Sequence, residues 1–316
     1  MGLNVFGPVP SRRLGKSIGI NNIPPKTCSY ACIYCQVGKT THWLKERHNF
    51  FEPDLLIDET RQKIAQLNNP QQEVDYLTIV SDGEPTLDAQ LGPLIRGLQS
   101  LRFPVAVITN SSLLSDESVR ADLNLADYVS VKFDAASDHV WKKINRPMRG
   151  QSLDAILNGL QQFARFYHGR FVTETMLLKD INDHKNEIDD IATTLTTIKP
   201  KIAYIAVPTR PPAVKTVKPA TEETVTRAYH VFSSKGLVAE LLVGYEGNAF
   251  AASGDARNDI LSITAVHPMR RDALENLLKK NRASWHVVNE LVQEDRLTKI
   301  QYGDFTYYAR QLKRVE

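Results

Sequence analysis

Short apolar runs rich in β-branched residues alternate with helix-like segments through most of this chain, which limits the folds open to it. Six runs read as strands, at 17–23, 75–85, 104–114, 127–136, 170–180 and 201–212. The intervening segments have helical spacing, at 87–101, 115–124, 137–145, 152–168 and 184–198, and Ser115 is the expected N-cap of the second. Strands separated by helices of this length predict βαβ units, a parallel sheet and an α/β fold.

Polar residues follow the predicted strands at the points where the strands end. The segments are "SDGEP" at 81–85, "TNSS" at 109–112, "KFDAAS" at 132–137, "ETMLLKD" at 174–180 and "PTRPP" at 208–212. Ligands bind at the carboxyl ends of the strands in parallel sheets, so these segments are expected to converge on one site.

The pattern changes after about Gly254. Segments 255–268, 269–281 and 284–296 read as short helices, and 297–312 reads as two strands joined by a turn at Gly303-Asp304. Three helices followed by a hairpin predict a small winged-helix-like domain at 255–316, after a larger domain at 1–250. The small, polar segment "EGNAFAASGDA" at 246–256 is the expected boundary.

All three cysteines of the chain, Cys28, Cys32 and Cys35, fall within eight residues in "KTCSYACIYCQVG". An odd, clustered set is not a disulfide framework. Each could be a small buried hydrophobe, or the three could bind zinc with His42 or His48 as a fourth ligand. A third interpretation is an iron–sulfur cluster, in which three thiolates leave one iron open, as catalysis requires.

The start of the chain has no apolar run of signal-peptide length, and Phe6 breaks the myristoylation pattern. No segment approaches the ~18 uninterrupted apolar residues of a membrane helix. We therefore expect a cytoplasmic protein with no membrane partner, in a reducing compartment where thiolates can bind metal. The net charge of +3 permits a polyanionic partner without arguing for one.

The motif C-x3-C-x-aromatic-C, with Tyr34 as the aromatic residue, resembles the signature of the radical S-adenosylmethionine (radical SAM) enzymes. The resemblance implies a partial (β/α)6 barrel in which Cys28, Cys32 and Cys35 bind a [4Fe–4S] cluster. S-adenosylmethionine would coordinate the fourth iron, which has no cysteine ligand. The implied reaction is reductive cleavage of SAM to a 5′-deoxyadenosyl radical that abstracts a substrate hydrogen. The alternative from another class is a zinc-binding winged-helix regulator without catalytic activity.

The loop "SDGEPTL" resembles the Gly-Gly-Glu-Pro motif of the same superfamily, with Asp82 in place of the first glycine. A glycine lets backbone approach a ligand, and a carboxylate can accept from the SAM ammonium. The resemblance implies these cofactor-binding residues: Tyr34, Gly83, Glu84, Pro85, Asn110, Ser111, Lys132 and Asp134. Arg146 and Arg210 are candidates for holding a carboxylate or an anionic substrate.

A wider likeness extends along nearly the whole chain, through "FGPVPSRRLGKSIGINNIPPK", "KFDAASDHVWKKINRP", "PTRPP", "EGNAF" and "ITAVHPMR". It resembles a bacterial and archaeal group related to the tRNA wyosine synthases. Those synthases bind a second cluster through three further cysteines, which are absent here. That difference argues against wyosine synthesis itself, and leaves a protein, a peptide or a tRNA as the expected substrate.

The resemblance also implies an electron donor such as a flavodoxin or a ferredoxin. The predicted recognition helix of the C-terminal domain, 284–296, contains Glu290, Glu294 and Asp295. Acidic side chains near phosphates oppose nucleic-acid binding. The sequence therefore favours a protein-contacting or structural role for this domain over RNA binding.

Overall fold

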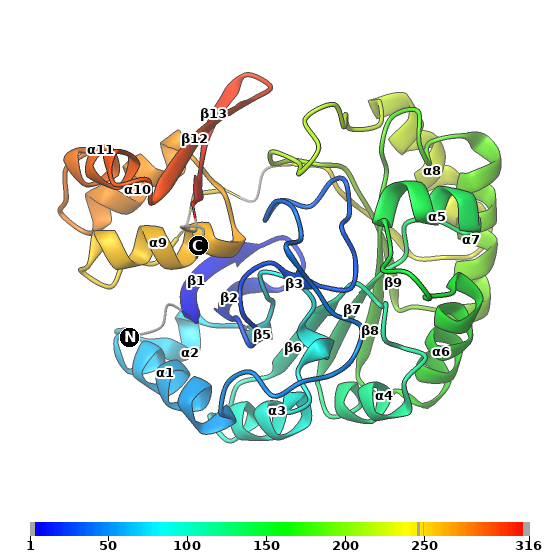
Figure 1. Cartoon of the computed structure of the whole chain (residues 1–316), viewed down its shortest axis with the longest axis horizontal. Helices are drawn as coiled ribbons and strands as arrows, with labels where there is room; N and C mark the ends of the chain where they lie inside the picture. Colours follow the sequence, from blue (N-terminus) through cyan, green and yellow to red (C-terminus); the bar gives the residue numbers. More distant parts are fainter. Residues whose placement is uncertain (1–3, 245–246, 249, 312–316) are drawn as a thin grey trace.

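The structure is a computed structural model, and it describes residues 4–244, 247–248 and 250–311. Its centre is a curved sheet of eight strands in the order β1-β2-β5-β6-β7-β8-β9-β10 (Figure 1). The strands are β1 Val5–Ser11, β2 Gly15–Ile20, β5 Tyr76–Ile79, β6 Val105–Thr109, β7 Tyr128–Lys132, β8 Arg170–Met176, β9 Ile202–Ala206 and β10 Ala239–Leu242. All neighbouring strands from β2 to β10 are parallel, while β1 pairs antiparallel with β2.

Helices connect the parallel strands and cover the outer face of the sheet (Figure 1). They are α1 Pro53–Ala65, α2 Pro70–Glu73, α3 Leu91–Gln99, α4 Glu117–Leu123, α5 Asp138–Asn145, α6 Leu153–Phe166, α7 Lys185–Ile198 and α8 Glu222–Ser234, with a 3-10 turn at η1 Pro85–Leu87. This open sheet with alternating helices confirms the predicted partial barrel. The predicted N-cap of α4 was wrong, because Asp116 rather than Ser115 accepts from the amide of Ser118.

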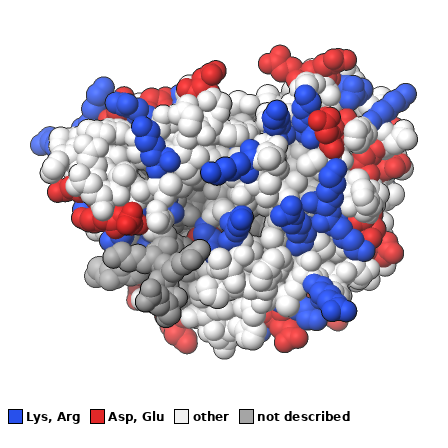
Figure 2. Space-filling model, turned by 45° about the horizontal axis from the view of Figure 1, so that its top comes forward, with Lys and Arg blue, Asp and Glu red and all other residues white. Residues whose placement is uncertain are grey.

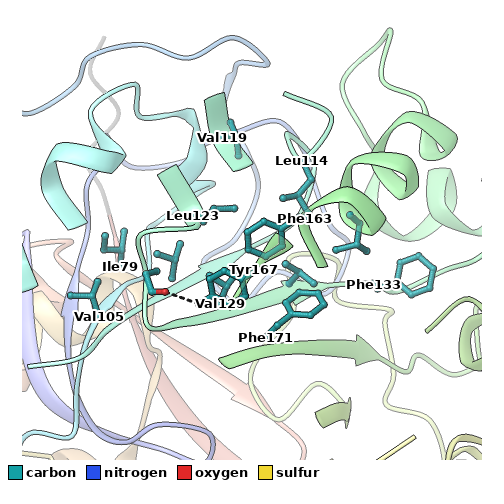
Figure 3. Packing of buried hydrophobic residues seen from close by; sticks show 14 of the residues in the cluster. Ile79, Val105, Leu114, Val119, Leu123, Val129, Phe133, Phe163, Tyr167 and Phe171 are labelled. Carbon is teal, nitrogen blue, oxygen red and sulfur yellow. Dashed lines mark hydrogen bonds between the residues drawn. The ribbon is translucent and has the colours of Figure 1, made fainter. Parts of the chain in front are cut away.

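Residues of each strand alternate between the helix-covered face and the interior of the curved sheet. On β7, Val129 and Val131 point toward the helices and join the main core, where Phe163, Tyr167 and Phe171 pack together (Figure 3). Tyr128, Ser130 and Lys132 of the same strand therefore face the interior. The alternation thus places polar side chains at the carboxyl end of β7 inside the barrel.

The C-terminal segment consists of three helices and a three-stranded antiparallel sheet in the order β11-β13-β12. Its elements are α9 Ala256–Val266, β11 Met269–Arg270, α10 Arg271–Lys280, α11 His286–Gln293, β12 Leu297–Tyr302 and β13 Phe305–Arg310. Tyr302 pairs with Phe305 across the predicted Gly303-Asp304 turn. The expected boundary segment lies partly outside the described residues, at 246 and 249, as do the last residues, 312–316.

The edge strand β1 joins the two parts of the chain. Phe6 and Val9 of β1 are buried in the same apolar cluster as Phe250, Ile260 of α9 and Leu277 of α10. The C-terminal segment therefore packs on the N-terminal strand rather than standing apart (Figure 1). In the described ranges, no helix is long and apolar enough to cross a membrane.

Candidate radical SAM site

The cysteine loop follows β2 and includes the short strand β3, Thr27–Cys28, which pairs with β4, His42–Trp43. Cys28, Cys32 and Cys35 are free thiols on the wall of one cavity. Cys28 Sγ lies 3.4 Å from Asn110 Nδ2, and Cys32 Sγ lies 3.4 Å from Asn145 Nδ2. N–H groups aimed at sulfur stabilise a metal-bound thiolate, so this environment fits an iron–sulfur ligand set.

Burial raises the pKa of all three thiols, that of Cys32 to about 12. The neighbouring Glu84 carboxylate raises the pKa of Cys28 further, and Cys35 and Asp134 do the same for Cys32. Without a cation these thiols therefore stay protonated at neutral pH. A bound metal cluster would reverse that preference, because coordination deprotonates a thiol.

Gly83 fixes the distance between the cysteine loop and the "SDGEP" loop. A Cβ at this position would lie 1.8 Å from the carbonyl oxygen of Thr27. The adjacent Glu84 amide donates to the same oxygen at 3.1 Å. Only glycine permits this approach, which places Cys28 directly beside the end of β5.

The polar strand ends do converge, as the sequence predicts. A cavity of about 230 Å³ lies between the cysteine loop and the carboxyl ends of the strands. Its wall includes the three cysteines with Tyr34 and Gly38, the strand-end residues Asp82, Gly83, Glu84, Asn110, Lys132, Glu174 and Arg210, and Val266 of α9.

The Glu84 carboxylate is fully buried and joins two of these loops. Oε1 accepts from the amide of Thr86 at 3.0 Å, the hydroxyl of Thr86 at 2.5 Å and the hydroxyl of Thr109 at 2.7 Å. Oε2 accepts from the amide of Asn110 at 2.7 Å. The two amides can only donate, so this cage fits the ionised carboxylate. Oε2, with one described partner, keeps capacity for a further donor in the cavity.

Lys132, Glu174 and Arg13 form a charged network on the interior face of the sheet. Lys132 and Glu174 are register partners on β7 and β8, and their side chains form an ion pair; Arg13 pairs with the other Glu174 oxygen. Burial and the Arg13 guanidinium lower the pKa of Lys132 to about 8. The Lys132 ammonium also lies 5.9 Å from the centre of the Tyr34 ring.

Three of the predicted cofactor-binding residues, Pro85, Ser111 and Asp134, are not among the described residues that line the cavity. Pro85 begins η1 behind Glu84. Ser111 Oγ donates to the carbonyl of Lys132 at 2.8 Å. Asp134 accepts from Tyr34, at 2.5 Å, and from Asn145. The structure thus places these three where they support the lining residues, and their contact with a cofactor stays a prediction.

Sequence reasoning did not assign a second set of cavity residues, Arg12, Arg13 and Gln36, to the site. Gln36, next to Cys35, accepts from Arg210 at 2.9 Å and donates to the carbonyl of Val266 at 3.0 Å. Arg210 in turn lies 2.9 Å from His267 Nε2. In the sequence, only the position of Gln36 beside Cys35 could have pointed to the site. Its contacts are with residues more than 170 positions away, which produce no pattern in the sequence around Gln36.

His42 and His48, the histidines considered as zinc ligands, are exposed and do not line the cavity. Across the described ranges, no three or more His, Cys, Asp or Glu side chains converge so as to hold a single metal ion, whereas the thiolates of a four-iron cluster each bind a different iron. Neither histidine is therefore in place to complete a Cys3His site with the cysteines.

Comparison with known proteins supports the class that this fold and site indicate. The family model of the radical SAM superfamily matches residues 22–193, just over half of the chain, so this chain belongs to the radical SAM superfamily and is an enzyme of that class. It is also similar to the UPF0026 protein MJ1312 of Methanocaldococcus jannaschii, with 42% identity covering 98% of this chain and 96% of that protein. The UPF0026 protein slr1464 of Synechocystis sp. is 36% identical, covering 73% and 83%.

Solved structures show the same fold at low identity. One is TYW1 with a lysine–pyruvate adduct bound, with a TM-score of 0.54 and 16% identity over 69% of this chain and 73% of that one. Another is SuiB of Streptococcus suis bound to the precursor peptide SuiA, with a TM-score of 0.55 and 13% identity over 72% and 49%. At this identity the likeness extends to the fold alone.

Proposed function

We propose that this enzyme cleaves S-adenosylmethionine reductively at a [4Fe–4S] cluster held by Cys28, Cys32 and Cys35. The observation that carries the proposal is the meeting of three free thiols with the Glu84 carboxylate at one cavity. When bound, the cluster and SAM would supply the chemistry, a one-electron reductive cleavage of the sulfonium to methionine and a 5′-deoxyadenosyl radical able to take a substrate hydrogen.

The residues of this chain would bind, orient and shield these groups. Asn110 and Asn145 donate toward thiolate sulfur, which tunes the potential of a cluster. Glu84 lines the cavity, and its Oε2, with one described partner, has acceptor capacity for the SAM ammonium. Val37, Val80 and Val266 add apolar surface to the wall, which lowers the access of water to a radical.

The test is anaerobic reconstitution with iron and sulfide, followed by analysis for both elements and for 5′-deoxyadenosine. The wild type should bind about four irons, turn brown and form 5′-deoxyadenosine with a chemical reductant. Cys28→Ala, Cys32→Ala and Cys35→Ala should each lose the colour and the product. His42→Ala, the matched control, should keep both. A colourless protein with one tightly bound zinc would instead support the alternative of a zinc-binding regulator.

We further propose that residues 255–311 form a winged-helix-like domain with a structural role. Tyr302 and Tyr307 of the hairpin donate to the carbonyls of Pro208 and Thr209, which line the cavity. This contact supports a role in holding the β9 loop over the site. The substrate, a protein, a peptide or a tRNA, would then enter beside this domain.

The acidic helix α11 supports the same proposal. Glu290 and Glu294 pair with Arg257 of α9, so this part of the helix already has its counter-charge within the domain. Val288 and Leu291 are buried against the other helices. The test is titration of the full chain with bulk tRNA at two salt concentrations. Asn289→Ala should leave any binding unchanged, and a loss of salt-dependent binding in this variant would contradict the structural role.

A further inference from the structure

The outer side of the cysteine loop is strongly basic. Three segments, 38–45, 142–150 and 213–219, together contain eight Lys and Arg residues and no Asp or Glu. Six of these side chains are exposed and have neither a described ion pair nor a described side-chain hydrogen bond, unlike Lys142 and Lys143; we call them the basic face: Lys39, Lys45, Arg146, Arg149, Lys215 and Lys218. Figure 2 shows Lys and Arg side chains gathered over the middle and right of this side of the molecule.

Backbone contacts bring the three segments together around the cysteine loop. The amide of Met148 donates to the carbonyl of Ser29 at 2.9 Å, and the amide of Val214 donates to the carbonyl of Ile33 at 3.0 Å. The ammonium of Lys45 lies 3.8 Å from the position that a Cβ would take at Gly150. The basic face is therefore one surface, built on the loop that holds the cysteines.

This surface lies close to a thiol but outside the cavity. Arg146 directly follows Asn145, whose Nδ2 lies 3.4 Å from Cys32 Sγ. All six residues of the basic face are described, and none of them lines the cavity. A partner on this face would thus reach the cysteine loop from behind and leave the cavity open to substrate.

We propose that the basic face docks an acidic one-electron carrier protein, with a low-potential flavin or iron–sulfur centre, that reduces the cluster. The inference rests on the proposed function, since a cluster at Cys28, Cys32 and Cys35 is the group that would accept the electron. In the step, the carrier's reduced centre loses one electron and the oxidised cluster gains it, with no bond made or broken. A nucleic-acid substrate fits less well, because its reacting group would have to enter the cavity rather than lie against the back of the loop.

One exposed aromatic residue gives this face an apolar anchor as well. Trp43 of β4 is 41% exposed and lies in the chain between Lys39 and Lys45. Tryptophan surrounded by complementary charge is typical of protein interfaces. The charges would steer the carrier to the surface, and the indole would contribute contact area once it is there.

The experiment compares two double charge reversals in the full-length reconstituted enzyme. Arg149→Glu/Lys215→Glu alters the basic face, and neither side chain has a described partner. Arg165→Glu/Lys201→Glu makes the same change in charge at the opposite end of the sheet, where α6 ends and β9 begins. The probe is a flavodoxin of strongly negative net charge, used oxidised to measure its dissociation constant and reduced to measure the rate of cluster reduction. Reduced methyl viologen, a small cation, is the control reductant, because it can reduce the cluster without docking on a protein surface.

We expect the first variant to bind flavodoxin at least about tenfold more weakly at low ionic strength, and to be reduced by it about tenfold more slowly. Both differences should shrink at high salt. The control variant should match the wild type in both measurements, and methyl viologen should reduce all three proteins. Equal binding and reduction by flavodoxin in the wild type and the first variant would overturn the proposal. Loss of tRNA binding with unchanged flavodoxin binding would assign the face to nucleic acid instead.

The proposed function and the docking proposal fail in different ways in this experiment. A protein without iron, or one that methyl viologen does not reduce, contradicts the cluster assignment. A protein that methyl viologen reduces normally, and flavodoxin reduces equally well in every variant, contradicts the docking face alone. The oxidised-flavodoxin titration tests the surface whether or not the cluster is present.

Discussion

Replacing Glu84 with glutamine removes one charge and almost no volume, and the structure predicts separate effects on stability and on SAM binding. The glutamine oxygen can keep the three donors at Oε1, from Thr86 and Thr109. Its amide nitrogen must then face the Asn110 N–H that now donates to Oε2 at 2.7 Å. A buried amide left without an acceptor costs about 1–3 kcal/mol. For a chain of this size we expect the unfolding midpoint to fall by roughly 1.5–4.5 °C.

The same substitution removes the acceptor for the SAM ammonium. A charge-assisted hydrogen bond contributes about 1.5–3 kcal/mol, so the dissociation constant for SAM should rise roughly tenfold to 150-fold. Iron content should stay at the wild-type level, because Glu84 is not one of the residues that would bind the cluster. The assays are differential scanning fluorimetry, iron analysis and equilibrium binding of SAM to the reconstituted protein.

Glu187→Gln is the matched control for this argument. Glu187 accepts from the amides of Ala136 and Ser137 and from the Ser137 hydroxyl, and it does not line the cavity. This variant should lose stability while keeping the SAM affinity of the wild type. Wild-type SAM affinity in Glu84→Gln, or an equal loss of affinity in Glu187→Gln, would refute the role of the Glu84 carboxylate.

Three further outcomes are expected. Gly83→Ala should reduce both stability and cluster incorporation, measured by thermal unfolding and iron analysis, because its Cβ would lie 1.8 Å from the Thr27 carbonyl oxygen. Folding lowers the pKa of Lys132 to about 8, so between about pH 8 and pH 10.5 the unfolded chain binds more protons than the folded chain. The contribution of Lys132 to the free energy of unfolding should therefore rise with pH over that range. This rise should be missing from Lys132→Met. Asn145→Leu should lower the reduction potential of the cluster, measured by redox titration, because it removes an N–H donor 3.4 Å from Cys32 Sγ.

The parallel strands and the cysteine site could be predicted because each depends on residues close together in sequence. Three of the five residues of β7 are β-branched or aromatic, and the cysteines with Gly83 and Glu84 lie in two short motifs. Strand β1 could not be predicted in the same way. Its sequence, "VFGPVPS", contains two prolines and a glycine, which normally argue against a strand. It is tolerated because β1 is an edge strand, where a missing N–H costs little.

Strand register explains why some predicted site residues do not reach the cavity. Alternation along β7 turns Lys132 to the interior, and Glu174, its register partner on β8, lies on the same face. Asp134, two residues beyond Lys132, follows the end of the strand, where alternation no longer determines direction, and it bonds instead to Tyr34 and Asn145. Sequence spacing identified the right loops, whereas the direction of each side chain depended on contacts made after folding.

The cysteine loop is held from three sides, and each contact serves a different part of the proposed chemistry. Gly83 and Glu84 fix its inner edge against β5, where SAM would bind. Asn145 and the residues after it hold its outer edge beneath the basic face, where an electron would arrive. Gln36 joins its end to Arg210 and to α9 of the C-terminal segment. Cofactor, electron and substrate would thus approach one short loop from separate directions, so a change in any one of these contacts should affect one step before the others.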